Sequence, residues 1–461
     1  MLTWVPKITA GNGPKYLAIA EALASDIRTG PLKPGDRLPP QRALAKALGV
    51  DLTTITRAFN EARRMGLIDA NSGRGSFVRG AANAPASPAQ PQSAIIDLSM
   101  NMPPQPIEAR LRERIQEGIA KILAQPQGLL LLNYQESVGA LPDRAAAARW
   151  LSPRLGPVPI ERIAVTSGAE SALYAILRLL AQPGDMICSP SLTYPGLLAI
   201  AERLKLRLAP ILQDDDGLVP EALEEACERD KPKAIYCIPT ISNPTTATMP
   251  QARREAVADI ARRYGVAIIE DDAYATLPRN APSPIATLAP DITWYVTTLS
   301  KCASPALRTA YVATPGLGET MSLAGEIRAL TLMAPPLMTA LASSWILDGT
   351  LDAITSAIRE ESSARQTIAR RILTGHAFQA HPDGHHIWLS LPARWRQSDF
   401  NLCARQSGLA LVPSDAFAIG DAPDAIRVSL GAAPDQNTVE RGLKLLATVL
   451  SQGPNTLSSI V

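Results

Sequence analysis

A lysine and an arginine follow one apolar run in the second half of the chain. Lys301 comes directly after TWYVTTLS (293–300), and Arg308 lies seven residues further on. A desolvated lysine amine can attack a carbonyl carbon and form a Schiff base. A lone lysine is more often a solvated surface residue, so its position at the end of an apolar run is what singles it out. The pattern favours covalent chemistry at Lys301.

Other polar groups also follow apolar runs. Asp271 is the next-to-last residue of VAIIEDD (266–272), and Asn243 lies in the turn-forming segment SNPT. The segment VTSGAESAL (165–173) reads as a strand, a small-residue turn and a helix, so backbone N–H groups of Gly168, Ala169 and Glu170 would point at an anion such as phosphate. Singly these signals are weak, because strand-end acids and turns are common.

The apolar runs predict how these residues are positioned. Continuous apolar strands that alternate with helical stretches indicate an α/β sheet buried on both faces. Ligands of such sheets bind in the loops beyond the strand ends. The predicted strands are IAVTS (163–167), MICSP (186–190), AIYCIP (234–239), VAIIEDD (266–272) and TWYVTTLS (293–300).

The first 80 residues differ in charge from the rest. They hold 12 Lys or Arg and 6 Asp or Glu, although the whole chain has a formal net charge of only +2. Helical patterns over 15–28, 40–48 and 51–65 precede short alternating strands at 67–69 and 76–78. The order of these elements predicts a winged helix-turn-helix, and the basic charge favours a polyanionic partner.

This N-terminal segment resembles the head of GntR-family regulators. The resemblance covers 15–79 and rests on PGDRLPPQR, on the TT that opens the third helix, and on GRGSFV. Since a recognition helix places its N-terminal residues at base edges, the resemblance implies double-stranded operator DNA as partner. The DNA-binding residues would be Arg42, Thr53, Thr54, Arg57 and Arg74. Leu52 stands where many members have Arg, so base preference does not carry over.

From residue 97 onward the chain resembles fold-type-I aminotransferases, and the pairing with a GntR head resembles the MocR subfamily. The resemblance implies pyridoxal 5'-phosphate held as an aldimine on Lys301, with Lys301, Asp271 and Tyr274 as the catalytic set. Asp271 would pair with the pyridine nitrogen, and Tyr274 and Asn243 would bind the phenolic oxygen. The remaining implied contacts are Tyr194 stacking on the ring; Gly168, Ala169, Glu170, Thr298 and Arg308 at the phosphate; Tyr134 from a partner subunit; and Arg427 on a ligand carboxylate.

We therefore expect a GntR-type domain at 1–79, a linker at 80–96 that is rich in Ala, Pro, Ser and Gln, and an aminotransferase-like domain with large and small parts at 97–461. Five scattered cysteines and four histidines give no metal-site spacing. The N-terminus shows no signal-peptide pattern and no apolar run is long enough to span a membrane, so we expect a cytoplasmic protein.

Three functions fit these features. The first is a homodimeric transcription regulator that senses the cofactor, or an amino acid or amine that exchanges with Lys301. The second is a working aminotransferase whose head is secondary, which turnover of an amino donor and a keto acceptor would reveal. The third is a cofactor-free dimerisation scaffold, which the presence of Lys301, Asp271 and Arg308 disfavours.

Overall fold

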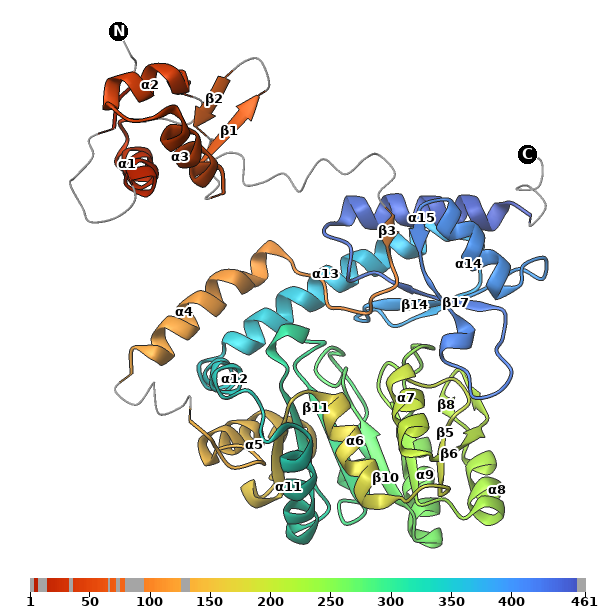
Figure 1. Ribbon diagram of the computed structural model, residues 1–461. Coiled ribbons are helices and arrows are strands. Elements are labelled where there is room, and N and C mark those ends of the chain that lie inside the picture. The colour runs from red at the N-terminus through yellow and green to blue at the C-terminus, as the bar shows by residue number, and fades with distance from the viewer. Residues whose placement is uncertain are drawn as a thin grey trace. The chain divides into compact units, whose positions relative to one another are not determined.

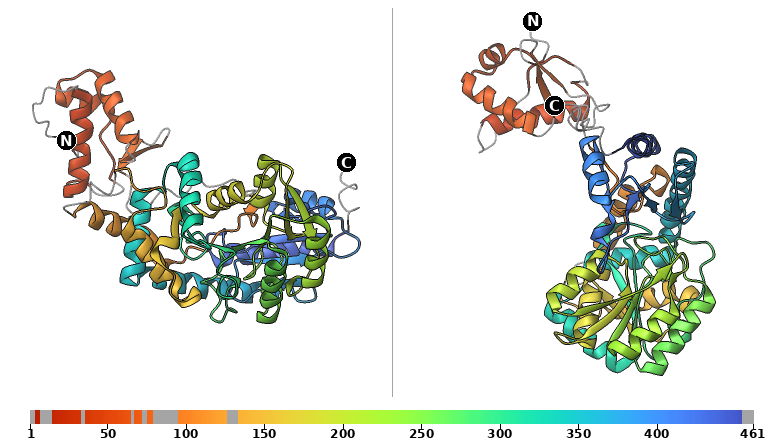
Figure 2. Two further views of the ribbon diagram at one scale, coloured as in Figure 1. Left: turned by 90° about the horizontal axis from the view of Figure 1, so that it is seen from below. Right: turned by 90° about the vertical axis from the view of Figure 1, so that its right-hand side faces the viewer.

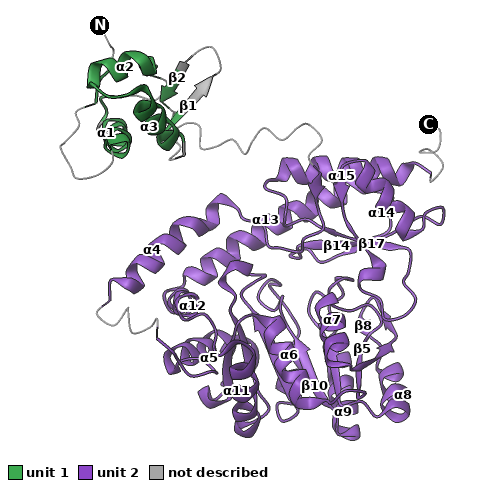
Figure 3. Cartoon of the chain, viewed as in Figure 1, with its two compact units in different colours: residues 1–94 green, residues 95–461 purple. Residues whose placement is uncertain are grey.

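The computed structural model describes residues 4–6, 15–32, 36–64, 67–71, 75–78, 95–125 and 133–453. The chain divides into two units, residues 1–94 and 95–461 (Figure 3). Most of the predicted linker lies outside the described residues, but its last residue, Ile96, begins a short strand of the second unit.

The first unit, called the head, has the predicted winged helix-turn-helix plan (Figure 1). Its apolar core includes Ile19, Leu44 and Phe59, one from each helix. Gly49 ends the second helix with a left-handed φ of 62°, which glycine adopts without strain. The elements are α1 (Lys15–Thr29), α2 (Gln41–Leu48), α3 (Leu52–Arg64), β1 (Ile68–Asn71) and β2 (Gly75–Val78), with β1 and β2 antiparallel.

The second unit, called the body, is built on a seven-stranded sheet of order β4-β12-β11-β10-β9-β5-β6. All five predicted apolar runs are strands of this sheet, and helices lie over both its faces (Figure 2). The strands are β4 (Ile163–Thr166), β5 (Met186–Pro190), β6 (Arg207–Ile211), β9 (Ala234–Cys237), β10 (Ala267–Asp271), β11 (Thr293–Thr298) and β12 (Ala310–Ala313).

One edge of this sheet gathers the chain's polar loops. β6, β5, β9, β10 and β11 run parallel, and β12 runs antiparallel to both β11 and β4. Strands β4, β5, β9, β10 and β11 therefore end at the same edge, where β12 begins. Each of the predicted cofactor-binding segments except that of Tyr134 follows or precedes a strand at this edge.

Twelve α-helices are described in the body. They are α4 (Leu111–Leu123), α5 (Leu141–Leu155), α6 (Ala169–Leu180), α7 (Pro195–Leu204), α8 (Pro220–Asp230), α9 (Gln251–Tyr264), α10 (Ile285–Leu288), α11 (Leu317–Thr331), α12 (Pro336–Asp348), α13 (Thr350–Ile372), α14 (Gln397–Gln406) and α15 (Gln436–Ser451). No helix in the described ranges is long and apolar enough to cross a membrane.

A smaller part of the body has its own sheet and apolar core. Its strands have the order β13-β14-β17-β16, and a separate parallel pair joins β15 to β3. Helices α13, α14 and α15 contribute to this core. The strands are β3 (Ile96–Asp97), β13 (Phe378–Ala380), β14 (His386–Ser390), β15 (Leu409–Ala410), β16 (Val412–Pro413) and β17 (Ala425–Ser429), beside the body's short hairpin of β7 (Gln213–Asp214) and β8 (Gly217–Leu218).

Candidate functional site

Lys301 lies just beyond the carboxyl end of β11 and is partly buried. Its Nζ donates a hydrogen bond to the backbone oxygen of Asn101 at 2.6 Å and lies 5.7 Å from the centre of the Tyr274 ring. Desolvation lowers the pKa of the amine to about 8; nearby Arg427 lowers it further, and Asp271 acts in the opposite direction. A lysine with a pKa near neutrality supplies the unprotonated amine that attack on a carbonyl requires.

Asp271 ends β10 and is only 4% exposed. Its Oδ2 accepts a hydrogen bond from the Tyr236 hydroxyl at 2.8 Å, and its Oδ1 is buried with no partner in the described part of the chain. Burial raises the pKa of this carboxyl to about 6. A buried acceptor without a donor is costly, so this site fits a ligand that brings an N–H group, as a protonated pyridine nitrogen does.

Tyr274 is buried three residues after Asp271, and its hydroxyl accepts a hydrogen bond from Asn101 Nδ2 at 2.8 Å. The same amide nitrogen lies 3.4 Å from Nδ1 of His386, whose Nε2 faces the backbone oxygen of Ser242 at 3.3 Å. Because a carbonyl only accepts, His386 carries its proton on Nε2, and the Asn101 amide donates to both neighbours. The Tyr274 hydroxyl proton is then free to be donated to a ligand oxygen.

The turn after β4 forms a narrow cradle at Gly168 and Arg308. Arg308 Nη2 donates to the backbone oxygen of Ser167 at 3.0 Å, and a Cβ on Gly168 would lie only 2.8 Å from that Nη2. The first N–H groups of α6, at Ala169 and Glu170, have no partner within the helix. Free N–H groups at a helix N-terminus beside an arginine bind phosphate groups.

Thr298 ends β11 beside this cradle. Its Oγ1 lies 2.9 Å from the Ser300 hydroxyl and 3.1 Å from the backbone oxygen of Thr309. A cavity of about 370 Å³ opens nearby, and its lining includes Glu170 and Arg308. The sequence did not mark Ser300, which lies one residue before Lys301 and adds a second hydroxyl to this corner.

Arg427, on β17, is only 7% exposed and stacks on the Phe417 ring at 4.9 Å. Its Nη1 donates to Oδ1 of Asn243 at 2.9 Å and its Nη2 donates to the backbone oxygen of Ser99 at 2.7 Å, while its Nε has no partner. In the described part of the chain no carboxylate is paired with it, and desolvation lowers its pKa. A buried guanidinium held by neutral oxygens fits an incoming carboxylate.

Tyr194 directly precedes α7, at the N-terminus of that helix. Desolvation raises its pKa to about 12, and the charges of Glu170, Asp271, Arg308 and Arg427 also act on it. The structure thus brings every predicted cofactor and ligand residue together except Tyr134. That tyrosine is 85% exposed in a single chain.

Two adjacent histidines also reach the site, which the sequence did not predict. His385 Nε2 lies 2.7 Å from the backbone oxygen of Lys301, and its Nδ1 lies 2.9 Å from the Ser362 hydroxyl of α13. Burial lowers the pKa of His385 to about 3, so the ring is neutral. Among the described residues no cluster of metal ligands exists. Through their hydrogen bonds, His385 positions the backbone of Lys301 and His386 positions the side chain of Asn101.

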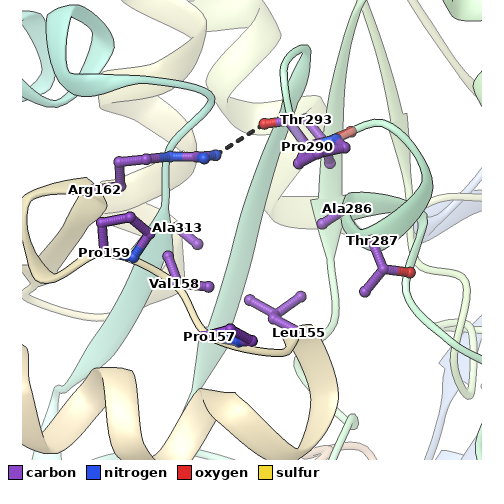
Figure 4. Close-up of a pocket in the computed structure, with 10 residues that line it drawn as sticks. All are labelled: Leu155, Pro157, Val158, Pro159, Arg162, Ala286, Thr287, Pro290, Thr293 and Ala313. Carbon is purple, nitrogen blue, oxygen red and sulfur yellow. Dashed lines mark hydrogen bonds between the residues drawn. The ribbon is translucent and has the colours of Figure 1, made fainter.

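A separate pocket of about 270 Å³ lies at the opposite edge of the sheet (Figure 4). Thr293, the first residue of β11, and Ala313, the last of β12, line it together with prolines and aliphatic residues. The Arg162 guanidinium there already donates to the backbone oxygens of Thr314 and Pro290. This pocket contains none of the predicted site residues.

In the head, the predicted DNA-contacting residues lie on α2 and the start of α3. Arg42, Thr53 and Arg57 are exposed and Thr54 is half-buried. Gln41 Oε1 accepts a hydrogen bond from Thr56 Oγ1 at 2.9 Å, which joins the two helices. Arg74 lies outside the described residues.

Comparisons with known proteins agree with both units. The family model of bacterial regulatory proteins of the gntR family matches residues 15–78, and that of aminotransferase class I and II matches residues 93–446. An uncharacterized HTH-type transcriptional regulator, YdeF of Bacillus subtilis, is 30% identical over 97% of this chain and 97% of its own length.

Two further proteins show the same likeness. The vitamin B6 salvage pathway transcriptional repressor PtsJ of Salmonella typhimurium is 26% identical over 90% of this chain and 94% of its own length. The structure of Pyrococcus horikoshii kynurenine aminotransferase, solved in complex with PMP, matches with a TM-score of 0.72 at 25% identity, over 78% of this chain and 91% of that one. The chain therefore belongs to the aminotransferase class I and II family through its body and to the gntR family of bacterial regulatory proteins through its head, the combination that defines MocR-type transcription regulators.

Proposed function

We propose that this protein regulates transcription by coupling operator binding in the head to the occupancy of a pyridoxal-phosphate site in the body. The observation that carries the proposal is the buried acceptor of Asp271 beside the amine of Lys301, whose pKa is about 8. When bound, the cofactor supplies an aldehyde that links to a primary amine and a ring that withdraws electrons.

The residues of this chain divide the binding task. Lys301 provides the amine, Asp271 faces a ring nitrogen, and Tyr274 and Asn243 face a ring oxygen. Tyr194 covers the ring, while the α6 N-terminus, Thr298 and Arg308 hold the phosphate. Tyr134 reaches the phosphate of the other subunit in a homodimer, which accounts for a tyrosine that is 85% exposed in a single chain.

The effector is an amino acid or amine that competes for the cofactor's link to Lys301. Arg427 favours an effector with a carboxylate, because its buried guanidinium has no acidic partner in the described part of the chain. Neutral His385 holds the backbone of Lys301 in place while the effector amine takes the place of the Lys301 amine on the cofactor. The head reads operator DNA through Thr53, Thr54 and Arg57, with Arg42 and Arg74 on the DNA backbone.

The test is spectroscopic. Purified protein given pyridoxal phosphate should absorb light where the ultraviolet and visible ranges meet. Reduction with borohydride should leave the cofactor attached to Lys301, and Lys301→Ala should lose both signals. Lys121→Ala, at an exposed lysine on α4, is the matched control and should keep both. A native protein that stays colourless with excess cofactor would refute the proposed cofactor site.

A second measurement separates a regulator from an enzyme with the same site. Retention of a promoter fragment should change with cofactor and amino acid, whereas turnover of an amino donor and a keto acceptor should be negligible. Sustained turnover combined with unresponsive DNA binding would assign the body to catalysis instead.

A further inference from the structure

Two consecutive aspartates each accept a hydrogen bond from a buried tyrosine of a neighbouring strand. Asp271 ends β10, and Asp272 follows it. Tyr236 of β9 donates to Asp271 Oδ2 at 2.8 Å, and Tyr295 of β11 donates to Asp272 Oδ2 at 3.0 Å. Each tyrosine lies in register with the residue two positions before its aspartate. Because side chains alternate along a strand, the two pairs lie on opposite faces of the sheet.

The two carboxylates differ in their second partner. Asp272 Oδ2 also accepts a hydrogen bond from Arg154 Nη2 at 2.7 Å, so a cation balances its charge. Asp271 has no ion pair in the ranges that the structure describes, and its Oδ1 is buried without a partner. Tyr236 is therefore the side chain that holds the Asp271 carboxyl, and it does so without bringing a charge.

Tyr236 acts on Asp271 as a hydrogen-bond donor. Its side chain is fully buried, and burial together with the charge of Asp271 raises the pKa of the phenol well above its ordinary 10. Burial also raises the pKa of Asp271, and the hydrogen bond from Tyr236 acts against this rise. The phenol thus favours the ionised carboxylate and leaves its negative charge for a group at Oδ1. The other groups whose charges interact with Asp271 are Asp272, Lys301, Tyr194, Tyr274 and Cys237.

We propose that Tyr236 sets the position of the proton between Asp271 and the ring nitrogen of the cofactor, and keeps that proton on the nitrogen. The inference rests on the proposed function. Without the hydroxyl, the carboxylate would bind a proton more tightly, so the proton would move from the ring nitrogen to Asp271 and leave both groups neutral. With the hydroxyl, the site holds a cationic ring against an ionised carboxylate. Tyr236 is a positioning residue, since it acts through Asp271.

The first test is nitrogen NMR of the full-length protein loaded with pyridoxal phosphate that is isotope-labelled at its ring nitrogen. The native protein should give the resonance of a protonated ring across the neutral pH range. A hydrogen bond to a charged group corresponds to about tenfold or more in an equilibrium constant. In Tyr236→Phe the proton equilibrium should therefore shift toward Asp271 by about that factor, while the variant still binds the cofactor.

The absorbance of the bound cofactor gives an independent readout. A positive ring lowers the pKa of the linked Lys301 nitrogen, because like charges in one conjugated system repel each other. The pH at which the absorbance changes should therefore rise in Tyr236→Phe. Tyr295→Phe is the matched control, because it removes the same kind of bond from Asp272 on the opposite face of the sheet. It should change neither the ring-nitrogen resonance nor the pH of the absorbance change.

A third measurement needs no cofactor. In the cofactor-free protein, Tyr236→Phe should raise the pKa of Asp271 above its value of about 6. The infrared band of this carboxyl is measured as the difference from the same protein carrying Asp271→Asn. If Tyr236→Phe does not fold, fluorotyrosine at this position keeps the hydroxyl in place and makes it a stronger donor, so it should lower the pKa of Asp271 instead.

Three results would overturn the inference. The first is a coloured native protein in which Tyr236→Phe moves neither the ring-nitrogen resonance nor the pKa of Asp271, and this result leaves the proposed function standing. The second is a shift of equal size in Tyr295→Phe, which would assign the effect to a general change in the sheet. A native protein that takes up no cofactor would overturn both the proposed function and the role of Tyr236.

Discussion

Asp271→Asn should stabilise the cofactor-free protein while weakening its hold on the cofactor. The buried Asp271 carboxyl has a pKa of about 6 against an ordinary value of 3.8. Because its pKa is raised in the folded state, the ionised carboxylate destabilises the fold. The penalty begins as the pH rises above about 4 and is complete above about 6.

The pKa difference corresponds to about 3 kcal/mol at pH 8 and about half of that at pH 5. The asparagine side chain is uncharged and avoids this penalty, but its amide nitrogen would face the space at Oδ1 without an acceptor. That unpaired donor costs about 1–2 kcal/mol. We therefore expect a net gain in unfolding free energy of about 1–2 kcal/mol at pH 8, and none at pH 5.

Urea unfolding of the cofactor-free protein at both pH values measures this difference. Asp291→Asn is the control, and its unfolding free energy should fall rather than rise at pH 8. The hydrogen bond from Arg262 lowers the pKa of that exposed carboxyl, so its ionised form stabilises the fold. In parallel, the cofactor dissociation constant of Asp271→Asn should rise at least tenfold, since a neutral amide no longer favours a protonated ring nitrogen. An Asp271→Asn protein that is destabilised equally at both pH values would refute the reasoning.

Two further predictions concern the head and the subunit contact. Arg57→Ala should weaken operator binding by about 1–3 kcal/mol and leave the cofactor spectrum intact, measured by DNA titration; unchanged affinity would place base readout elsewhere. Tyr134→Ala should weaken cofactor retention, and mixing it with Lys301→Ala should restore one intact site in each mixed dimer, measured by absorbance per chain. Failure of the mixture to regain colour would remove Tyr134 from the partner's site.

The sequence predicted the parts of the fold whose signal is local. Five apolar runs of the large sheet and the whole plan of the head were predicted correctly. Strands β6 and β12 were missed. β6 contains Pro210, which an edge strand tolerates but which interrupts the apolar pattern. Nothing in the local pattern of β12 singled out this strand.

The missed site residues have a different cause. Ser99 and Asn101 act largely through backbone oxygens, which residue type does not reveal, and Asn101 meets His386 across 285 positions of sequence. His385 directly precedes β14 and His386 is its first residue, a position that does not mark either histidine as a site residue. Their neutral state and their contacts depend on burial, which no local pattern encodes.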